Sequence, residues 1–204
     1  MTNAEEYIDR VLDVMPRGTP MRSQVSLELR GAIAERISDG RTLDDVLLQL
    51  GDPVRLAESY LAAEPLVAAP LGRRALARIL DGLTVLGVIA PIAWSAAGYV
   101  PPDFLFPMVA LIVLLGGSIL FGLYLIVAEA LFGQTLGKQL LGLRVVRENG
   151  ARIGVGQAIV RQLPLFLQIP WIDVLFAFFT EKRQRAFELL SKTRVVRAAP
   201  QEFR

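Results

Sequence analysis

Four charged side chains interrupt long apolar stretches of the sequence and are the residues best placed to do chemistry. They are Asp81, Glu129, Arg161 and Asp173. Because a charged side chain at the centre of a bilayer costs about 2.5–3.5 kcal/mol on insertion scales, such groups face one another or water rather than lipid. We predict that Asp81 and Glu129 form a proton or cation site with Arg161 as counter-ion. The alternative is an internal salt-bridge cluster that only locks helices together, and the sequence leaves both interpretations open.

Two arginines extend this candidate pathway along the first apolar stretch. Arg74, Arg78 and Asp81 lie at positions i, i+4 and i+7, which places them on one face of a helix. At this spacing the arginines are expected to pair with the carboxylate of Asp81. Arg74 therefore belongs to the predicted ion or substrate pathway, together with the four residues above.

The composition excludes whole classes of chemistry. The 204 residues include neither cysteine nor histidine, which removes disulfides, thiolate nucleophiles and every mechanism that depends on imidazole. No spacing of the remaining carboxylates and lysines singles out a catalytic group, so we expect no enzyme, no metal site and no cofactor. The segment GQTLGK is not a phosphate loop, since Gly133 and Gly137 are too close together and Gln139 stands where such loops have Ser or Thr.

The elements that position these residues are those of a membrane protein. Hydrophobic residues make up 53% of the chain and charged residues only 21%, which is too apolar for an ordinary soluble domain. Residues 79–99 and 104–132 each reach the roughly 20 residues needed to span a bilayer, so two full transmembrane helices are expected. The loop between them, 98–103, has no Lys or Arg, whereas 133–152 has four and is therefore expected in the cytoplasm.

A third apolar stretch, residues 153–179, is expected to be broken. Pro164 and Pro170 interrupt it, and the chain that follows is rich in Lys and Arg, which favours the cytoplasmic side. We predict a broken or interfacial helix followed by a return segment, with both termini of the protein in the cytoplasm. A single kinked crossing with an external carboxyl tail is the alternative.

Residues 1–64 have the pattern of a soluble helical bundle. Apolar side chains recur every three or four residues in three amphipathic helices, and Gly-Asp-Pro at 51–53 ends one helix and begins another. Thr42 and Asp45 have the spacing of a capping box with Asp in place of Glu. The segment resembles the cytosolic helical domain called HAAS, which is found at the amino end of many small bacterial membrane proteins.

The chain is expected to divide into this bundle, a linker at 65–72 and a membrane domain at 73–204. The charges divide in a similar way, since residues 1–70 carry seven basic and twelve acidic side chains, and the rest carries fifteen and eight. An acidic head is thus joined to a basic membrane domain.

The predicted cytoplasmic loop also has strand character. Residues 143–146 include two valines, the Asn-Gly pair at 149–150 is typical of a tight turn, and 152–153 can return along the first segment. We predict a small β-hairpin, with 194–196 as a candidate third strand. The predicted fold class is an all-α membrane protein with two full transmembrane helices, a broken third segment, this hairpin and the amino-terminal bundle.

Three motifs occur in the order and roughly the spacing of the RDD family of small membrane proteins. They are RRALARILDGL, GQTLGKQLLGLRVV and KRQRAFELLSKTRVV, and the resemblance covers residues 71–197. The first family pattern falls on Arg74, Ala77 and Asp81. The loop and carboxyl patterns fall on a set of mostly small and polar residues: Gly133, Thr135, Gly137, Lys138, Gly142, Arg144, Glu188 and Thr193. Glu188 stands where the family usually has aspartate, which puts a role for a second aspartate in doubt.

This resemblance implies a polytopic membrane protein that moves ions or small solutes, or a membrane adapter. We expect Lys138 and Arg144 to meet anionic lipid headgroups, and Gly122 and the Gly116-Gly117 pair to serve helix packing.

The sequence therefore predicts a multi-pass protein of the bacterial inner membrane that does not bind nucleic acid. The leading function is transport or exchange of small solutes or cations, which would require a homo-oligomer because two spans form thin walls for a pathway. The rival is a non-catalytic adapter or signalling protein that docks a cytosolic partner through residues 1–64.

Overall fold

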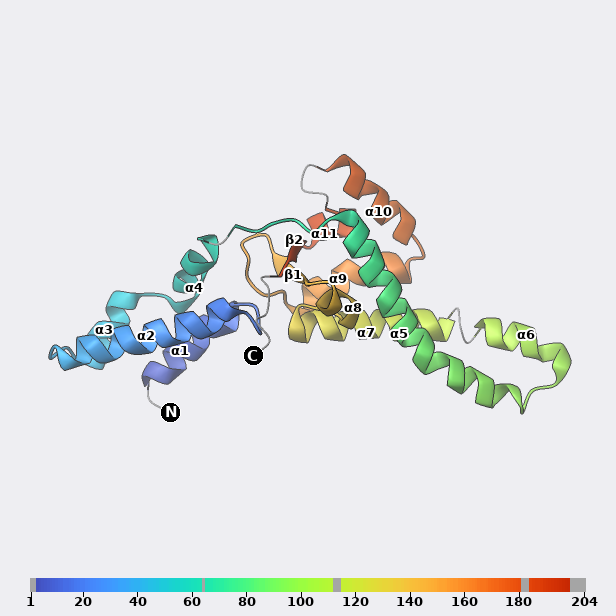
Figure 1. The fold of residues 1–204 in the computed structure, drawn as a ribbon, viewed down its shortest axis with the longest axis horizontal. Helices are drawn as coiled ribbons and strands as arrows, with labels where there is room; N and C mark the ends of the chain where they lie inside the picture. The colour runs from blue at the N-terminus through green and yellow to red at the C-terminus, as the bar shows by residue number, and fades with distance from the viewer. Residues whose placement is uncertain (1–2, 64, 112–114, 181–183, 199–204) are drawn as a thin grey trace.

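The computed structural model describes residues 3–63, 65–111, 115–180 and 184–198, and it is mostly helical (Figure 1). Residues 3–63 form a head of four helices: α1 (Asn3–Val14), α2 (Pro20–Ser38), α3 (Leu43–Leu50) and α4 (Pro53–Ala62). Buried side chains from all four helices, among them Ile8, Leu29, Val46 and Leu61, form one hydrophobic core. The predicted amino-terminal helices are confirmed.

Local capping explains where two of these helices begin. Thr42 Oγ1 accepts a hydrogen bond from the N–H of Asp45 at 3.2 Å, and the Asp52 carboxylate accepts one from the N–H of Arg55 at 3.0 Å. Pro53 lies in the first turn of α4, where its missing N–H would have had no helical partner. The predicted capping spacing and the Gly-Asp-Pro helix boundary are therefore both found in the structure.

The head is held against the rest of the chain by hydrogen bonds to main-chain carbonyl groups. Arg144 donates to the carbonyl of Arg17, in the loop between α1 and α2, and Arg17 in turn donates to the carbonyl of Leu131 at 3.4 Å. The N–H of Arg152 donates to the carbonyl of Val14 at 3.0 Å. The head is thus docked on the protein rather than suspended from a tether.

One described helix, α5 (Leu71–Ala97), is long and apolar enough to cross a membrane, over Leu71–Ser95. The second predicted span, 104–132, lies in two shorter apolar helices, α6 (Pro102–Leu111) and α7 (Gly117–Phe132). Between them, 112–114 lie outside the described residues. Two full spans are therefore not confirmed.

The third apolar stretch is sharply bent. Helices α9 (Val155–Phe166) and α10 (Pro170–Phe179) meet at an angle of 112°. Gln168, between them, has a left-handed backbone with φ of 59°, and Pro170 begins the second helix because it cannot continue the first. The predicted break in this stretch is therefore present, and its geometry suits both a broken span and a segment that returns.

The sheet differs from the predicted hairpin. Strand β1 (Leu143–Arg147) pairs antiparallel with β2 (Thr193–Arg197), in a register that places Val145 opposite Val195. The Asn-Gly turn forms, since the N–H of Gly150 donates to the carbonyl of Arg147, but the returning chain then leaves the strand. The hairpin prediction was wrong because the returning chain forms a hydrogen bond to the end of α1 and buries Ile153. The segment predicted as a third strand is instead the partner of β1.

The predicted linker is also part of this small structure. Ala68 forms an isolated bridge with Val196, and the N–H of Ala69 donates to the carbonyl of Val195 at 3.0 Å. Strand β2 therefore lies between β1 and the chain that leads from the head into α5. Two short helices precede the strands along the chain, α8 (Leu136–Leu140) before β1 and α11 (Ala186–Leu190) before β2.

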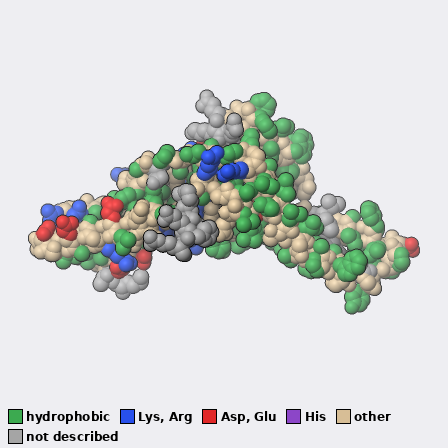
Figure 2. Space-filling view, in the orientation of Figure 1, with side chains coloured by type: hydrophobic (Ala, Val, Ile, Leu, Met, Phe, Trp, Pro, Cys, Tyr) green, Lys and Arg blue, Asp and Glu red, His purple; other side chains and the backbone are tan. Residues whose placement is uncertain are grey.

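Large apolar side chains cover the surface of the long helices. Trp94 on α5 is 85% exposed and Phe179 on α10 is 86% exposed. In Figure 2, hydrophobic side chains spread over the half of the molecule formed by α5 and α6, whereas charged side chains gather at the far end of the head. An exposed apolar surface of this extent is typical of a protein surrounded by lipid.

We expect Arg144→Ala to loosen the attachment of the head, because a hydrogen bond from a charged donor contributes about 1.5–3 kcal/mol. Tryptic cleavage between Arg17 and Gly18 should become roughly tenfold faster, since about 1.4 kcal/mol corresponds to a factor of ten. The matched control is Arg147→Ala, on the same strand, whose side chain bonds to Gln157 rather than to the head. Equal cleavage rates in the two variants would contradict this role of Arg144.

Candidate functional site

Charged side chains from six elements of the membrane domain meet in one place, which we call the buried ionic cluster. It consists of five cations and four carboxylates: Arg74, Arg78, Lys138, Arg161, Arg185, Asp81, Glu129, Asp173 and Glu188. All five residues of the predicted pathway belong to it. The four carboxylates are almost fully buried, so each must find its hydrogen bonds within the protein.

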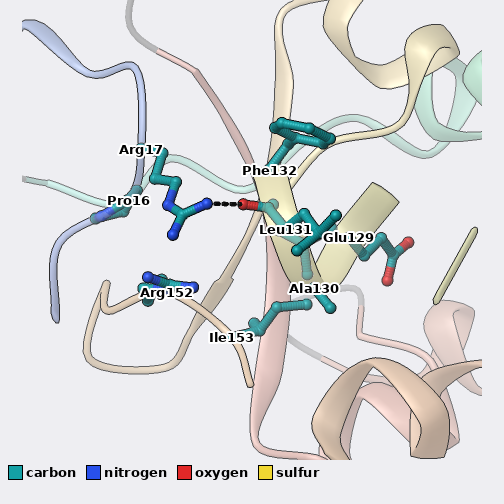
Figure 3. A pocket seen from close by; sticks show the side chains of 10 residues that line it. Pro16, Arg17, Glu129, Ala130, Leu131, Phe132, Arg152 and Ile153 are labelled. Carbon is teal, nitrogen blue, oxygen red and sulfur yellow. Dashed lines mark hydrogen bonds between the residues drawn. The ribbon is translucent and has the colours of Figure 1, made fainter. Parts of the chain in front are cut away.

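Glu129, near the end of α7, has no solvent exposure and lies between two cations. Its carboxylate accepts from the Lys138 ammonium on one oxygen and from Arg161 Nε on the other, at 3.0 Å. Figure 3 shows that Glu129 points away from the head, whereas the Leu131 carbonyl on the same helix accepts from Arg17 on the opposite side. The cavity on that side holds only about 10 Å³. The predicted pairing of Glu129 with Arg161 is therefore present.

Arg161, on α9, links Glu129 to a second carboxylate. Its guanidinium donates to Glu188 at 3.4 Å and to the Thr193 hydroxyl at 2.7 Å. Glu188 is also paired with Arg74 and with Arg185 Nε at 3.0 Å. Burial raises the pKa of Glu188, but the surrounding arginines outweigh it and hold that pKa below its ordinary value of 4.5. The glutamate that replaces the usual aspartate is thus a fully engaged carboxylate.

Asp81 has different partners from those predicted. Its carboxylate accepts from the Thr135 hydroxyl at 2.6 Å, the Gly137 N–H at 2.8 Å and the Tyr124 hydroxyl at 3.0 Å. Neither Arg161 nor an arginine of α5 pairs with it among the described contacts, because the start of α8 and Tyr124 of α7 bring these neutral donors to it instead. Asp81 anchors α8 to α5 rather than sharing a counter-ion with Glu129.

Two arginines of α5 form contacts with other helices. Arg74 pairs with Glu188 on α11, and Arg78 donates to Gln162 Oε1 on α9 at 3.3 Å. Asp173, on α10, accepts from the Phe187 N–H at 2.9 Å and lies 3.5 Å from Arg185. The predicted pairing of the arginines within α5 was wrong because tertiary partners lie closer to their guanidinium groups.

Lys138 and Arg144 were expected to meet lipid headgroups, and the structure corrects this. Lys138 is buried against Glu129, and Arg144 is buried between Gln134 and the head loop. Burial lowers the pKa of the Lys138 ammonium to about 8, and the Glu129 carboxylate limits the fall. The sequence held a signal for this pairing, because the turn at Gly133, with φ of 69°, folds α8 back toward the end of α7.

Glycines of the family pattern permit this close packing. A Cβ atom on Gly137 would lie 2.2 Å from the carbonyl oxygen of Ala77 on α5, so no larger residue fits. Gly122 on α7 similarly faces the Phe166 ring of α9, at 2.3 Å from a hypothetical Cβ. The predicted packing role of Gly122 is thus fulfilled within one chain. Gly142 has φ of 62°, which suits glycine at the turn into β1.

Within the described residues, no three acidic side chains come together in a way that could hold a metal ion. The carboxylates of the cluster face arginine, lysine or neutral donors. The arrangement can therefore bind and exchange protons or small charged groups only where a member of the cluster gives up a partner.

Residues 68–192, which are more than half of the chain, match the family described as the RDD family. The chain belongs to the RDD family. The match includes every residue of the buried ionic cluster, and it supports a membrane protein. It begins after the head, so the HAAS assignment of residues 1–64 stays a prediction.

A bacterial relative has a similar sequence over part of the chain. The uncharacterized protein YxaI of Bacillus subtilis (strain 168) is 44% identical over 64 residues, which are 30% of this chain and 42% of that protein. The matched segment thus spans less than half of the relative. No solved structure matches the chain.

We expect Gly137→Ala to destabilise the protein by about 1–3 kcal/mol, the usual cost of overpacking, because the new methyl group meets a main-chain carbonyl that cannot turn away. Thermal unfolding in detergent measures the effect. Gly82→Ala on α5 is the control, since a Cβ there meets nothing within 4 Å. The packing argument fails if both variants melt at the same temperature.

Proposed function

We propose that this RDD protein transports small cations across the bacterial inner membrane by exchange with protons, and that Lys138 and Glu129 form the exchanging pair. The observation that carries the proposal is the place of Lys138. Its ammonium belongs to the buried ionic cluster, and the residue also lines an open groove between α5 and α10. A proton on Lys138 can therefore leave toward the groove while Glu129 keeps Arg161 as its partner.

The other members of the cluster are less suited to proton exchange. Arginine side chains stay charged at all physiological pH values. Glu188 is surrounded by three arginines, whose contacts stabilise its charged form. With a pKa lowered to about 8, Lys138 changes charge near physiological pH. A group with such a pKa is suited to reversible proton transfer.

The pathway would require more than one copy of the chain. The single described helix that meets the length and hydropathy of a span, together with the bent pair, cannot by itself enclose a route. We therefore propose a homo-oligomer in which spans of neighbouring copies complete the walls, with both termini in the cytoplasm.

Purified full-length protein in liposomes that contain a pH-sensitive dye tests this proposal. With an opposing cation gradient, we expect proton flux that increases as the pH passes about 8, because Lys138 releases its proton above that value. Lys138→Arg should lower the flux at least tenfold and remove the pH step, since an arginine keeps its proton.

Lys192→Arg is the matched control, because Lys192 lies in the turn before β2, outside the cluster. Absence of flux through the wild-type protein would overturn the transport proposal. Wild-type flux in Lys138→Arg would instead overturn the role of the pair.

A second candidate function, that of a membrane adapter, is favoured by the surface of the head. Leu48 on α3 is 82% exposed, and Leu27 on α2 is also exposed, although the bundle has a complete core of its own. Exposed leucines on a cytosolic head can bind an amphipathic partner.

For the adapter function, we expect a cytosolic protein to co-purify with the wild-type chain. Leu48→Asp should abolish this co-purification while leaving proton flux unchanged. Leu189→Asp, on α11 of the membrane domain, is the control with the same chemical change at an exposed site outside the head. If the partner is retained by Leu48→Asp, the adapter surface lies elsewhere and this assignment is wrong.

A further inference from the structure

An open groove of about 720 Å³ lies between α5 and α10. Apolar side chains form its walls, with Ile79 on α5 facing Trp171, Val174 and Phe178 on α10. Much of this wall is exposed, since 69% of Phe178 is uncovered. The buried ionic cluster forms the floor, where four cations and one carboxylate line the groove: Arg74, Arg78, Lys138, Arg185 and Asp81. The groove thus joins a charged end to a long apolar side, which is the shape of an amphiphile.

The charges on the floor do not balance. The cluster has five cations and four carboxylates, so it carries one excess positive charge at neutral pH. Four of the cations have a carboxylate partner: Arg74, Lys138, Arg161 and Arg185.

Arg78 is the cation that lacks such a partner. In the described part of the chain, no carboxylate lies within 4.0 Å of its guanidinium. Its direct contacts are neutral, namely the Gln162 amide oxygen at 3.3 Å and the face of Phe121 at 5.0 Å, while the carboxylates of Glu129 and Asp81 act on it only from beyond ion-pair distance. A partly buried guanidinium with donors left over favours an anion that can accept two hydrogen bonds, and a phosphate does this best.

We propose that the groove binds an anionic phospholipid, with its phosphate on Arg78 and an acyl chain along the α10 wall. A soluble anion would satisfy Arg78 but would leave the apolar wall uncovered. A lipid satisfies both, because basic pockets between membrane helices on the cytoplasmic side are suited to anionic headgroups. The volume is within the range of roughly 300–1,000 Å³ that small-molecule sites occupy.

This proposal does not depend on transport, since lipid retention is measured without any flux. Full-length protein is exchanged into detergent with phosphatidylglycerol or with phosphatidylcholine, and the bound lipid is counted by native mass spectrometry. We expect the wild-type protein to retain phosphatidylglycerol at least tenfold more strongly than phosphatidylcholine. Arg78→Gln should reduce retention of phosphatidylglycerol to the phosphatidylcholine level.

Arg73→Gln is the matched control, because Arg73 is an exposed arginine on the same helix and does not line the groove. It should bind phosphatidylglycerol as the wild-type protein does. If Arg73→Gln and Arg78→Gln reduce the retention of phosphatidylglycerol equally, a general basic surface attracts the lipid and the proposed site is overturned.

A second pair of variants tests the apolar wall without changing charge. Val174→Phe places a ring inside the groove and should reduce retention of phosphatidylglycerol, whereas Leu175→Phe, at an exposed position of α10 outside the groove, should not. The melting temperature of each variant is measured in the same detergent, so that a loss of lipid is distinguished from a loss of fold. An unchanged affinity in Val174→Phe would overturn the acyl-chain position.

Inorganic phosphate distinguishes a lipid from a soluble anion. Millimolar phosphate should leave bound phosphatidylglycerol in place, because phosphate makes no contact with the apolar wall. Complete displacement by phosphate would show that the site recognises a free anion, and it would overturn the lipid proposal.

Discussion

The fold of the membrane domain depends on balancing the negative charge of one carboxylate that has no access to water. Glu129 lies on α7, and its two cations come from α8 and α9, so the three helices must meet at one point for the charge to be tolerated. Removal of either partner would leave an uncompensated buried charge, which costs about 3–5 kcal/mol. Arg161 extends the requirement, because its other donors reach Glu188 and Thr193 near the carboxyl end.

This constraint explains why the RDD pattern combines charged residues with glycines. A carboxylate such as Asp81 can accept the N–H of residue 137 only if the backbones of α5 and α8 approach closely. The carbonyl of Ala77 occupies the space that a side chain on Gly137 would need. Thr135 then serves two purposes, since its hydroxyl donates to Asp81 and accepts from the N–H of Lys138 at the start of α8.

Part of this structure could be predicted from the sequence, and the physical reason differs between elements. The head helices follow from local signals, because apolar spacing and caps such as Asp52 act within a few residues. The bend near Pro170 was predictable for the same reason. The cluster membership of Glu129 and Arg161 followed from the cost of a charge in lipid, which requires a partner but does not identify it.

What could not be predicted depends on contacts between distant segments. The Asn-Gly turn formed, but its returning chain bonds to Val14, far away in the sequence, so the strand partner came from 193–197. Gly133 signals a turn before Lys138, but the sequence does not show that this turn directs the ammonium inward to Glu129 rather than outward to headgroups. Asp81 likewise found neutral donors on α8 in place of the arginines one and two turns away.

The position of β2 has a consequence for biosynthesis. This strand lies between β1 and the segment around Ala68, so it joins the first and last parts of the membrane domain. Residues 193–197 are translated after all the other described helices and strands of the membrane domain. Until then Arg161 lacks the Thr193 hydroxyl, and Val195 cannot yet join the core that contains Leu143. The polar contacts at the centre of the nascent membrane domain therefore stay incomplete until β2 has been made.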